Sequence, residues 1–434
     1  MRLVVVGGGI TGLAAAYEAV VRGADVTLLE ASERLGGEVW TESVDGVPLE
    51  WGPDSFVASK PAASELAREL GLELIEPEPV ARRAYLVRGG ALVPFPPGLV
   101  MGIPRGIRSA LRATPGTGLR AAVRAAWEPV IPGGVHDEPV SELAARRLGP
   151  TWARRLVVPL VEGVYGAPGD RLGARAALPQ FAGRGSLVRT AKRQPTLTRA
   201  AFLSIRGGMG RVVERLGHEL ESADVRLRSS AVAIERSGDG FVVRTSDGDV
   251  TADRVLVAIP APLASSLVET IASRAAEALA RIRFGSSVVV QLRYRPEAIG
   301  RPLDGAGYLV PREEGFLHAA CTWSSAKWGH GGDTWLRAIV TTSSAVQLPD
   351  EELQRRVTKE VARIVRISDE PSDVRMHRWE VALPVYAPGH LDLVESIERE
   401  LPDGLAVAGA SYRGLGVPDC VAGGRSAAAR LLEI

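Results

Sequence analysis

The stretch VVVGGGITGLAAAYEA, from Val4 to Ala19, decides the fold of the first part of the chain. An apolar run leads into three spaced glycines, and an alanine-rich segment with helical spacing follows. In a G-x-G-x-x-G turn between a strand and a helix, Gly7 makes the tight turn, Gly9 lets the backbone approach a pyrophosphate, and Gly12 lets helix and strand pack closely. The helix N-terminus offers free N–H groups to the phosphates. The stretch therefore predicts a strand and a helix with a dinucleotide site between them.

Glu30 ends the next predicted strand, Asp25–Leu29, 18 residues after the third glycine of the turn. An acid at this place accepts the ribose hydroxyls of a dinucleotide and argues against a 2′-phosphate, so NADP is disfavoured. The segment ASERLGGEVWT follows at once and places Arg34, Gly36 and Gly37 where they can fold over the pyrophosphate of a longer cofactor. The chain has only one such fingerprint, which disfavours an NAD-linked reductase.

The composition is that of an ordinary soluble protein. The 434 residues are 46% hydrophobic and 24% charged, with a net charge of +1, which excludes a disordered chain and a supercharged nucleic-acid binder. Two cysteines, Cys321 and Cys420, exclude a disulfide framework and a cysteine-built metal site, and the six histidines have no ligand spacing. No apolar run is long enough for a transmembrane helix. We expect no metal, no nucleic-acid partner and a cytoplasmic location.

The neutral total hides an asymmetry of charge. Between Pro79 and Val213 there are 21 basic residues, all Arg except Lys192, and six acidic ones, so this segment carries +15 and the rest of the chain −14. One interpretation is a solvated basic surface in a chain that prefers Arg to Lys. The other is a region that faces an anion, which can be a polycarboxylate substrate, an anionic lipid or an acidic partner.

Strand and helix patterns alternate along the chain, and no internal repeat separates them. The predicted strands are Leu3–Val6, Asp25–Leu29, a hairpin of Ala84–Val87 with Ala91–Phe95, Val225–Arg228, Ala231–Glu235, Phe241–Thr245, Arg254–Ile259, Val288–Tyr294, Gly307–Val310, Leu336–Thr341 and Leu405–Ala408. The predicted helices end at Val21 after the glycine turn, span Pro61–Leu70, Glu351–Val365 and Cys420–Leu432, and fill an interrupted region from Gly98 to Val157.

Three segments resemble motifs of the flavin amine oxidase superfamily. The first is the E-x₃-R-x-G-G arrangement that begins at Glu30. The second is Trp51-Gly52-Pro53-Asp54-Ser55, at the spacing where these enzymes bring a Gly-Pro loop near the isoalloxazine. The third is VAGASYRGLGVPDCVAGGRSAAARLL, which has the form of the closing flavin motif and leads through Val417-Pro418-Asp419 into the last helix. The resemblance implies one FAD, with this helix N-terminus at the N1–C2 edge of the flavin, where it stabilises the reduced ring.

Within that superfamily the chain resembles the protoporphyrinogen and coproporphyrinogen oxidases over nearly its whole length. The stretches that carry this resemblance are GGGITGLAAAYEA, PLVEGVYG (159–166), SIRGGM (204–209), and RW with ALPVY and GH between 378 and 390. The resemblance implies that Trp379 lies beside the cofactor and that Val232 holds the adenine through its backbone. The alternative is that Trp379 and Tyr386 are core aromatics and that Val232 is an ordinary strand residue.

The predicted fold is α/β, with a Rossmann-like FAD-binding domain interleaved with a mixed-sheet substrate domain and a helical, basic subdomain. The expected parts are FAD-binding residues 1–80, a basic helical substrate region 81–205, FAD-binding residues 206–262, a substrate-binding sheet 263–390 and FAD-binding residues 391–434. The expected cofactor-binding residues are Gly7, Gly9, Ile10, Thr11, Gly12, Glu30, Ala31, Arg34, Gly36, Gly37, Gly52, Pro53, Asp54, Ser55, Val232, Trp379, Gly409, Val417, Pro418 and Asp419. The expected substrate-binding residues are Arg82, Arg83, Arg88, Gly163, Tyr165 and Gly166.

The resemblance implies oxidation of a porphyrinogen to a porphyrin. This reaction removes six electrons in three flavin cycles, with O2 as the acceptor and H2O2 as its product, and the cofactor supplies the redox chemistry. We identify no catalytic base, and His390 is expected to be structural. The +15 segment favours the substrate with four propionates over the one with two, so the function expected is conversion of coproporphyrinogen III to coproporphyrin III in heme biosynthesis.

Other functions stay open on the same scaffold. The nearest is protoporphyrinogen IX oxidation, followed by an amine oxidase or a carotenoid desaturase; a content of 5% aromatic residues argues against an aromatic amine cage. A flavin-binding scaffold that recruits a ferrochelatase is the non-enzymatic alternative. The basic stretch Pro104–Ala126 is expected to make at most weak, peripheral contact with the inner face of a membrane, because Trp127 is its only aromatic anchor. Cys420 is expected to be a buried thiol, with a thioether to the flavin as the alternative.

Overall fold

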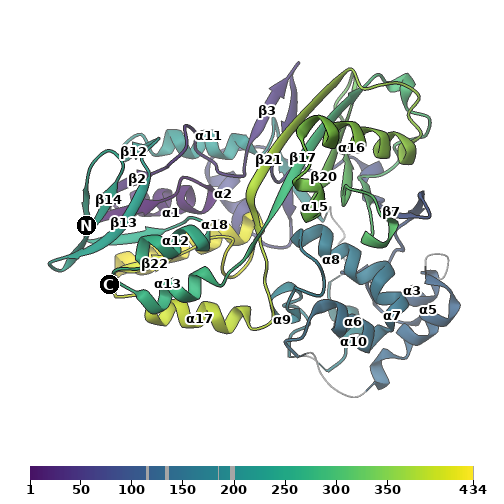
Figure 1. Cartoon of the computed structure of the whole chain (residues 1–434), viewed down its shortest axis with the longest axis horizontal. Coiled ribbons are helices and arrows are strands. Elements are labelled where there is room, and N and C mark those ends of the chain that lie inside the picture. Colours follow the sequence, from purple (N-terminus) through teal and green to yellow (C-terminus); the bar gives the residue numbers. More distant parts are fainter. Residues whose placement is uncertain (114–116, 132–135, 184, 196–200, 434) are drawn as a thin grey trace. The chain divides into compact units, whose positions relative to one another are not determined.

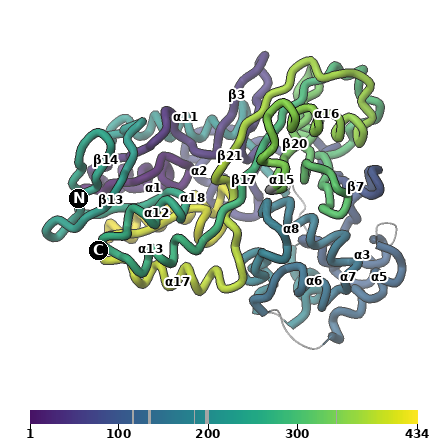
Figure 2. Tube along the Cα trace, in the orientation of Figure 1, coloured from purple at the N-terminus to yellow at the C-terminus, as the bar shows by residue number. Residues whose placement is uncertain are grey.

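The computed structural model describes residues 1–113, 117–131, 136–183, 185–195 and 201–433 (Figure 1). The chain divides into two compact units. Unit 1 comprises Met1–Glu76, Ala200–Arg283 and His390–Ile434, and unit 2 comprises Pro77–Arg199 and Phe284–Gly389. Each unit is therefore assembled from separate stretches of sequence, and both ends of the chain belong to unit 1, as the purple and yellow segments of Figure 2 show.

A five-stranded parallel sheet forms the centre of unit 1. Its strand order is β12-β2-β1-β16-β22. These strands are β1 (Arg2–Val6), β2 (Asp25–Leu29), β12 (Asp224–Arg226), β16 (Arg254–Val257) and β22 (Leu405–Val407). The helix α1 (Ile10–Val21) leads from β1 to β2 on one side, whereas β16 pairs with the other side of β1. The strand order thus reverses at β1, and in open α/β sheets a ligand binds outside the carboxyl ends of the strands at this point.

The last helix of the chain, α18 (Val417–Glu433), packs on α1, and the two lie side by side in Figures 1 and 2. Their contact is close because a Cβ atom on Gly424 would lie 2.2 Å from the carbonyl oxygen of Thr11. α18 begins three residues before the predicted start at Cys420, since Pro418 fits the first turn of a helix, where no N–H bond is required. The two ends of the sequence therefore build one cofactor-type domain.

The remaining elements of unit 1 surround this core. They are β3 (Thr41–Val44), β4 (Val47–Glu50), β5 (Phe56–Val57), α2 (Ala62–Glu69), β6 (Leu74–Ile75), β11 (Phe202–Ile205), α11 (Gly210–Glu219), β13 (Ala231–Ser237), β14 (Gly240–Thr245), β15 (Val250–Ala252), α12 (Ala261–Val268), α13 (Ser273–Ala280) and α17 (His390–Glu400). Residues 263–283 differ from the expected division, which assigned them to the substrate-binding sheet. They belong to unit 1 because α12 packs on β13 and α13 packs on α17.

A mixed seven-stranded sheet is the centre of unit 2. Its order is β21-β17-β20-β19-β18-β7-β8, and all neighbours are antiparallel except β18 and β7. The strands are β7 (Tyr85–Arg88), β8 (Ala91–Pro94), β17 (Phe284–Tyr294), β18 (Gly307–Leu309), β19 (Ala320–Trp323), β20 (Thr334–Val340) and β21 (Asp373–Pro384). The amphipathic helix α16 (Asp350–Val365) buries Leu353, Val357 and Val361 in the core on this sheet. The predicted hairpin of β7 and β8 is present, and it turns at Gly89–Gly90.

The other part of unit 2 is mainly helical. Its elements are η1 (Pro79–Arg82), β9 (Leu99–Val100), β10 (Ile103–Pro104), α3 (Ile107–Arg112), α5 (Leu119–Ala126), η2 (Glu128–Val130), α6 (Val140–Leu148), α7 (Pro150–Trp152), the π-type turn η3 (Ala153–Val157), α8 (Val158–Tyr165), α9 (Ala174–Ala177) and α10 (Leu187–Arg193). Short helices and loops also flank the sheet, namely η4 (Pro296–Ala298), η5 (Arg312–Glu314), α14 (Ser324–Trp328) and α15 (Ser343–Val346). In the part of the chain that the structure describes, no helix is long and apolar enough to cross a membrane.

A fully buried ion pair joins three elements of this helical part. Arg147 of α6 donates to Glu128 of η2 through Nε, at 2.7 Å, and through Nη2. Glu128 also accepts the backbone N–H groups of Leu187 and Val188 and the hydroxyl of Ser186, which fixes the start of α10. Arg147 further donates to the carbonyl oxygens of residues 131 and 185, at 2.9 and 2.7 Å. Because both charges are buried, each needs the other.

We therefore predict that removing one member of this pair destabilises the protein strongly. Arg147→Met or Glu128→Leu leaves an uncompensated buried charge and should lower the free energy of unfolding by about 3–5 kcal/mol. The double variant should lose less than the sum of the two. Denaturant unfolding measures this, and Arg154→Met, at an exposed position of η3, is the matched control. Single variants that unfold like the control would contradict the prediction.

Candidate functional site

The glycine turn after β1 has the geometry of a phosphate-binding loop. The N–H group of Gly7 donates to the carbonyl oxygen of Leu29, at 2.7 Å, and the N–H of Leu13 donates to the carbonyl oxygen of Gly9, at 2.9 Å. A Cβ atom on Gly12 would lie 1.8 Å from the carbonyl oxygen of Gly7, so no side chain fits where α1 leaves the strand. A Cβ atom on Gly9, in contrast, would meet nothing within 4 Å. The turn is closed on the strand side and open at Gly9, where a pyrophosphate can approach the backbone.

Glu30 is held at the edge of this turn. Its carboxylate accepts the N–H of Gly8 at 2.7 Å through Oε2 and the N–H of Ser32 at 2.8 Å through Oε1. The acid therefore lies at the carboxyl end of β2, next to the glycine turn, as a ribose-binding acid requires. Ala31, which follows it, is exposed.

The segment after Glu30 folds back on the glycine turn. The N–H of Gly36 donates to the carbonyl oxygen of Gly8 at 2.8 Å, and a Cβ atom on Gly37 would lie 3.2 Å from the Cα of Gly9. Arg34 braces this loop, because its Nη2 donates to the carbonyl oxygen of Gly37 at 2.8 Å and its guanidinium lies 4.6 Å from the ring centre of Trp40. The structure thus brings the predicted residues of the two loops together.

The first turn of α18 is next to the first turn of α1. Burial raises the pKa of the Cys420 thiol to about 12, while a hydrogen bond with Thr11 acts against the shift. The carboxylate of Asp419 accepts two hydrogen bonds from Nζ of Lys60, each at 2.7 Å. A Cβ atom on Gly409, at the end of β22, would lie 3.6 Å from Oγ1 of Thr11. The first turns of α1 and α18 therefore lie together beside the reversal of strand order, and the positive ends of the two helix dipoles suit the phosphate and flavin ends of one cofactor.

The Gly-Pro loop lies against the same segment. A Cβ atom on Gly52 would lie 1.7 Å from the carbonyl oxygen of Glu38, so glycine is required for this close approach. Asp54 accepts the hydroxyl of Ser55 at 2.8 Å through Oδ1 and that of Ser204 at 2.9 Å through its backbone oxygen. These contacts, with Pro53 between them, lie within unit 1.

Sequence reasoning missed Glu38. This half-buried acid follows the Gly36–Gly37 pair directly, and burial raises the pKa of its carboxyl to about 8. Its charge is close enough to raise the pKa of Cys420. The signal in the sequence was an acid directly after the Gly36–Gly37 pair, in the loop expected to cover a pyrophosphate, where a second negative charge is unfavourable unless the carboxyl keeps its proton.

Val232 and Trp379 have different surroundings. The pairing of β13 with β14 skips Val232, which is 56% exposed, so its backbone lies in a bulge and not in the regular ladder. Trp379 belongs to unit 2, where it pairs in register with Ser287 and its ring lies 4.2 Å from that of His377. The expected contacts of both residues with the cofactor stay predictions. His390 is buried, and its Nε2 bonds to the carbonyl oxygen of Tyr412 at 2.8 Å; its expected structural role stays a prediction.

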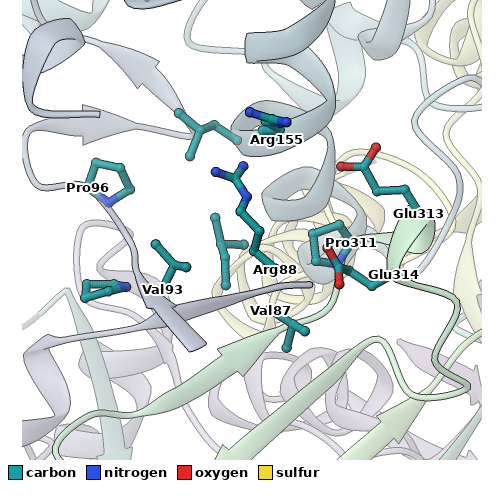
Figure 3. Close-up of a pocket in the computed structure, with 11 residues that line it drawn as sticks. Val87, Arg88, Val93, Pro96, Arg155, Pro311, Glu313 and Glu314 are labelled. Carbon is teal, nitrogen blue, oxygen red and sulfur yellow. The ribbon is translucent and has the colours of Figure 1, made fainter. Parts of the chain in front are cut away.

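The three arginines expected at the substrate rim do not converge. Arg83 forms an ion pair with Asp304 at 3.2 Å, and the hydroxyl of Tyr85 donates to the same carboxylate. Arg82 is exposed at the end of η1. Arg88, at the other end of β7, lines a separate small pocket (Figure 3).

Gly163 of α8 and Gly166, which directly follows this helix, have a packing role. A Cβ atom on Gly163 would lie 2.8 Å from Cδ2 of Leu309, and one on Gly166 would lie 2.6 Å from Cδ1 of Leu383. These glycines let α8 approach β18 and β21 closely. Tyr165 donates to the carbonyl oxygen of Ala177 at 3.1 Å, and its ring packs on that of Tyr386, with 5.9 Å between the centres.

Over the described ranges no cluster of acidic, histidine or cysteine side chains could hold a metal ion.

Comparison with known proteins places this chain in a family. The family model for flavin containing amine oxidoreductases matches residues 10–432, so the chain belongs to this family and is a flavin-containing oxidoreductase. It is 34% identical to the coproporphyrinogen III oxidase of Mycobacterium tuberculosis (strain ATCC 25618 / H37Rv), over 99% of this chain and 97% of that protein. It is 30% identical to the coproporphyrinogen III oxidase of Bacillus subtilis (strain 168), over 98% and 96%, and 31% identical to the protoporphyrinogen oxidase of Bos taurus, over 99% and 98%.

Solved structures show the same architecture. A crystal structure of a protein from Exiguobacterium sp. 255-15 is 33% identical and covers 100% of this chain and 99% of its own, with a TM-score of 0.88. A putrescine oxidase that is 20% identical covers 100% of both chains with a TM-score of 0.76, which shows the shared fold alone. The predicted α/β class and the recognition of the porphyrinogen oxidase group are confirmed.

The raised pKa of Glu38 predicts a pH dependence of stability. Between about pH 4.5 and 8 the folded protein keeps a proton that the unfolded chain has released, so stability falls as the pH rises through this range. Glu38→Gln removes the cost of ionising the buried carboxyl. We expect the flavin-free variant to be more stable than the wild type near pH 8 and equal to it below pH 4.5.

Thermal unfolding of the flavin-free proteins across this pH range measures the effect. Glu33→Gln is the matched control, because Glu33 lies in the same loop and is exposed, with its partner Arg228. A Glu38→Gln variant that follows the wild type at every pH would show that the carboxyl is ionised in the folded protein.

Proposed function

We propose that this chain is an FAD-dependent oxidase that converts coproporphyrinogen III to coproporphyrin III in heme biosynthesis. The observation that carries the proposal is similarity of 30–34% over nearly the full length to bacterial proteins named coproporphyrinogen III oxidase. The protoporphyrinogen oxidase of Bos taurus, at 31%, supports the same group of substrates and makes protoporphyrinogen IX the second candidate.

The choice of FAD rests on the shape of the site in unit 1. A glycine turn open at Gly9 suits a pyrophosphate, and Glu30 beside it suits a ribose, so the pair fits a dinucleotide and not a flavin mononucleotide. The N-terminus of α18 would face the flavin end, where its dipole stabilises negative charge on the ring. When bound, the flavin supplies two-electron oxidation, and three rounds account for the six electrons, with O2 reduced to H2O2.

The residues of this chain would bind and orient. Arg34 and the Gly36–Gly37 pair hold the loop over the pyrophosphate, and the ion pair of Lys60 with Asp419 fixes the first turn of α18. The pyrrole nitrogens of a porphyrinogen release their own protons as electrons leave, so the proposal assigns no general base. The proposal keeps the expected cofactor contacts of Val232 and Trp379. It also keeps the expected substrate contacts in unit 2, which are those of Arg82, Arg83, Arg88, Gly163, Tyr165 and Gly166.

The basic segment offers less positive charge to an anionic substrate than its total of +15 implies. Arg105 donates to the carbonyl oxygens of residues 194 and 195, and Arg124 to those of residues 146 and 147. Arg147 forms an ion pair with Glu128, and Arg146 forms an ion pair with Glu138. These side chains hold the helical part together. The preference for four carboxylates over two therefore rests on the remaining arginines and on the names of the relatives.

Anaerobic reduction of the bound flavin tests the function. We expect rapid bleaching by coproporphyrinogen III, slower bleaching by protoporphyrinogen IX, and none by benzylamine or phytoene. Moderate salt should slow the reaction with the tetracarboxylate more, because screening weakens its attraction to arginine. A preference for protoporphyrinogen IX without a salt effect would contradict the proposed substrate and favour protoporphyrinogen IX instead. No bleaching by any compound would favour a flavin-binding scaffold. Denaturation should release FAD, because the Cys420 thiol is buried and protonated at neutral pH.

We also propose that the α3–α5 region makes peripheral contact with the anionic inner face of a membrane. Five exposed apolar side chains form a stripe on these adjacent helices and the residue that follows them, with exposed fractions from 42% to 64%. They are Ile107, Leu111, Leu119, Val123 and Trp127. The exposed arginines 108, 112 and 120 flank the stripe, and no acidic residue occurs between Pro79 and Trp127. An apolar stripe with basic flanks fits an anionic lipid surface.

Sedimentation with lipid vesicles tests this contact. Binding should require phosphatidylglycerol in phosphatidylcholine vesicles. The triple variant Arg108→Gln, Arg112→Gln, Arg120→Gln should lose roughly 3 kcal/mol of binding free energy, about 1 kcal/mol for each charge. Trp127→Ser with Leu119→Ser should also weaken binding, whereas Val21→Ser, exposed on α1, should not. Absence of vesicle binding would contradict the proposed membrane contact. A protein partner, such as a ferrochelatase, would then be the remaining candidate for this surface.

A further inference from the structure

A small pocket in unit 2 brings two arginines together from different elements. Arg88 ends β7, and Arg155 lies in the π-type turn η3. Figure 3 shows their guanidinium groups directed toward one another, between the β7–β8 hairpin and the helix. The cavity has a volume of about 10 Å³, and its other walls are apolar side chains such as Leu86, Val93 and Leu156. π-type turns of this kind often occur at functional sites.

Neither guanidinium has a carboxylate partner within 4.0 Å among the residues that the structure describes. The hydrogen bond of Arg155 is a long one, 3.4 Å from Nη1 to the carbonyl oxygen of Thr117. Glu313 and Glu314 complete the lining of the pocket, but Oε2 of Glu314 accepts the N–H of Gly90, at 3.2 Å. Two half-buried cations thus face each other in a pocket whose two carboxylates form no ion pair with either of them.

The electrostatics of Arg88 agree with this geometry. Burial has the largest effect and lowers the pKa of its guanidinium. The charge of Arg155 lowers this pKa further, while Glu313 and Glu314 act against both effects. Two cations that repel one another in a partly desolvated place gain most from an anion between them. Guanidinium groups match the planar carboxylate best. The cavity is narrow, which favours the flat end of a carboxylate arm over a bulkier tetrahedral phosphate.

We propose that Arg88 and Arg155 bind a carboxylate group in this pocket. In a chain with the proposed function, the tetrapyrrole offers such a group on each propionate arm, and a free small carboxylate has the same chemistry. Arg155 is then a further carboxylate-binding residue, which the sequence did not reveal. Arg88 binds the carboxylate together with Arg155, and not together with Arg82 and Arg83.

Two probes of the holoenzyme distinguish these sources. The first is sodium acetate, compared with sodium chloride at equal ionic strength, with thermal unfolding as the readout. The second is coproporphyrin III, compared with its tetramethyl ester, with porphyrin fluorescence as the readout of affinity. The variants are Arg88→Gln, Arg155→Gln and Arg88→Lys, and the control is Arg189→Gln, at an exposed position of α10. Unfolding in chloride shows that each variant is folded.

We expect acetate to stabilise the wild type and the control, but neither glutamine variant. The glutamine variants should each bind coproporphyrin III about tenfold more weakly, because each loses a hydrogen bond to a charged group, while binding of the ester is unchanged. Arg88→Lys should restore part of the affinity. Loss of the acetate effect alone upholds the carboxylate site and assigns it to a free small carboxylate.

The proposal is overturned if both glutamine variants respond to acetate and to coproporphyrin III as the wild type does. A failure of the proposed function has a different signature. The wild type would then not bind coproporphyrin III at all, whereas the acetate effect would still disappear in the two glutamine variants.

Discussion

The cofactor domain depends on one steric constraint, the contact of Gly12 with the carbonyl oxygen of Gly7. With 1.8 Å available for a Cβ atom, no other residue lets α1 start directly at the end of β1. This start places the first N–H groups of the helix at the reversal of strand order, where the sheet leaves room for a ligand. The same principle joins the far end of the chain, since Gly424 brings α18 to within contact of the Thr11 backbone. Two glycines, more than 400 residues apart, therefore position two helix N-termini at one place.

The local elements of this domain were predictable because short-range rules decide them. The strand Asp25–Leu29 has the predicted bounds, and the helix of Glu351–Val365 begins one residue earlier in the structure. The edge strand β21 was not predicted, because its sequence DVRMHRWEVALP mixes charged and apolar residues on both faces, and pairing with β17 decides its conformation. The helix α17 is also absent from the prediction, although His390, Val394 and Ile397 have helical spacing.

The candidate site divides in the same way. Residues fixed by motif spacing, such as Glu30 and Gly36, meet in the structure because each motif is a local loop beside the same strand. Glu38 escaped prediction because burial and not sequence makes its carboxyl unusual. Arg155 was not predicted because Arg88 and Arg155 are 67 residues apart, so the pocket that they line has no linear sequence pattern. Charge counting could find the basic segment, but it could not separate arginines that bond to carbonyl groups from those that are available to a ligand.

That separation follows from the partners of each arginine. Arg147 is fully buried and stable there because Glu128 and two carbonyl oxygens satisfy it, so its charge is invisible outside the helical part. Arg88 and Arg155 are only half-buried and face one another, so their charge is available to an anion that enters from outside. The same residue type thus serves the fold in one place and recognition in another. A chain with almost no net charge can therefore bind acidic substrates, provided that a few of its guanidinium groups form no internal ion pair.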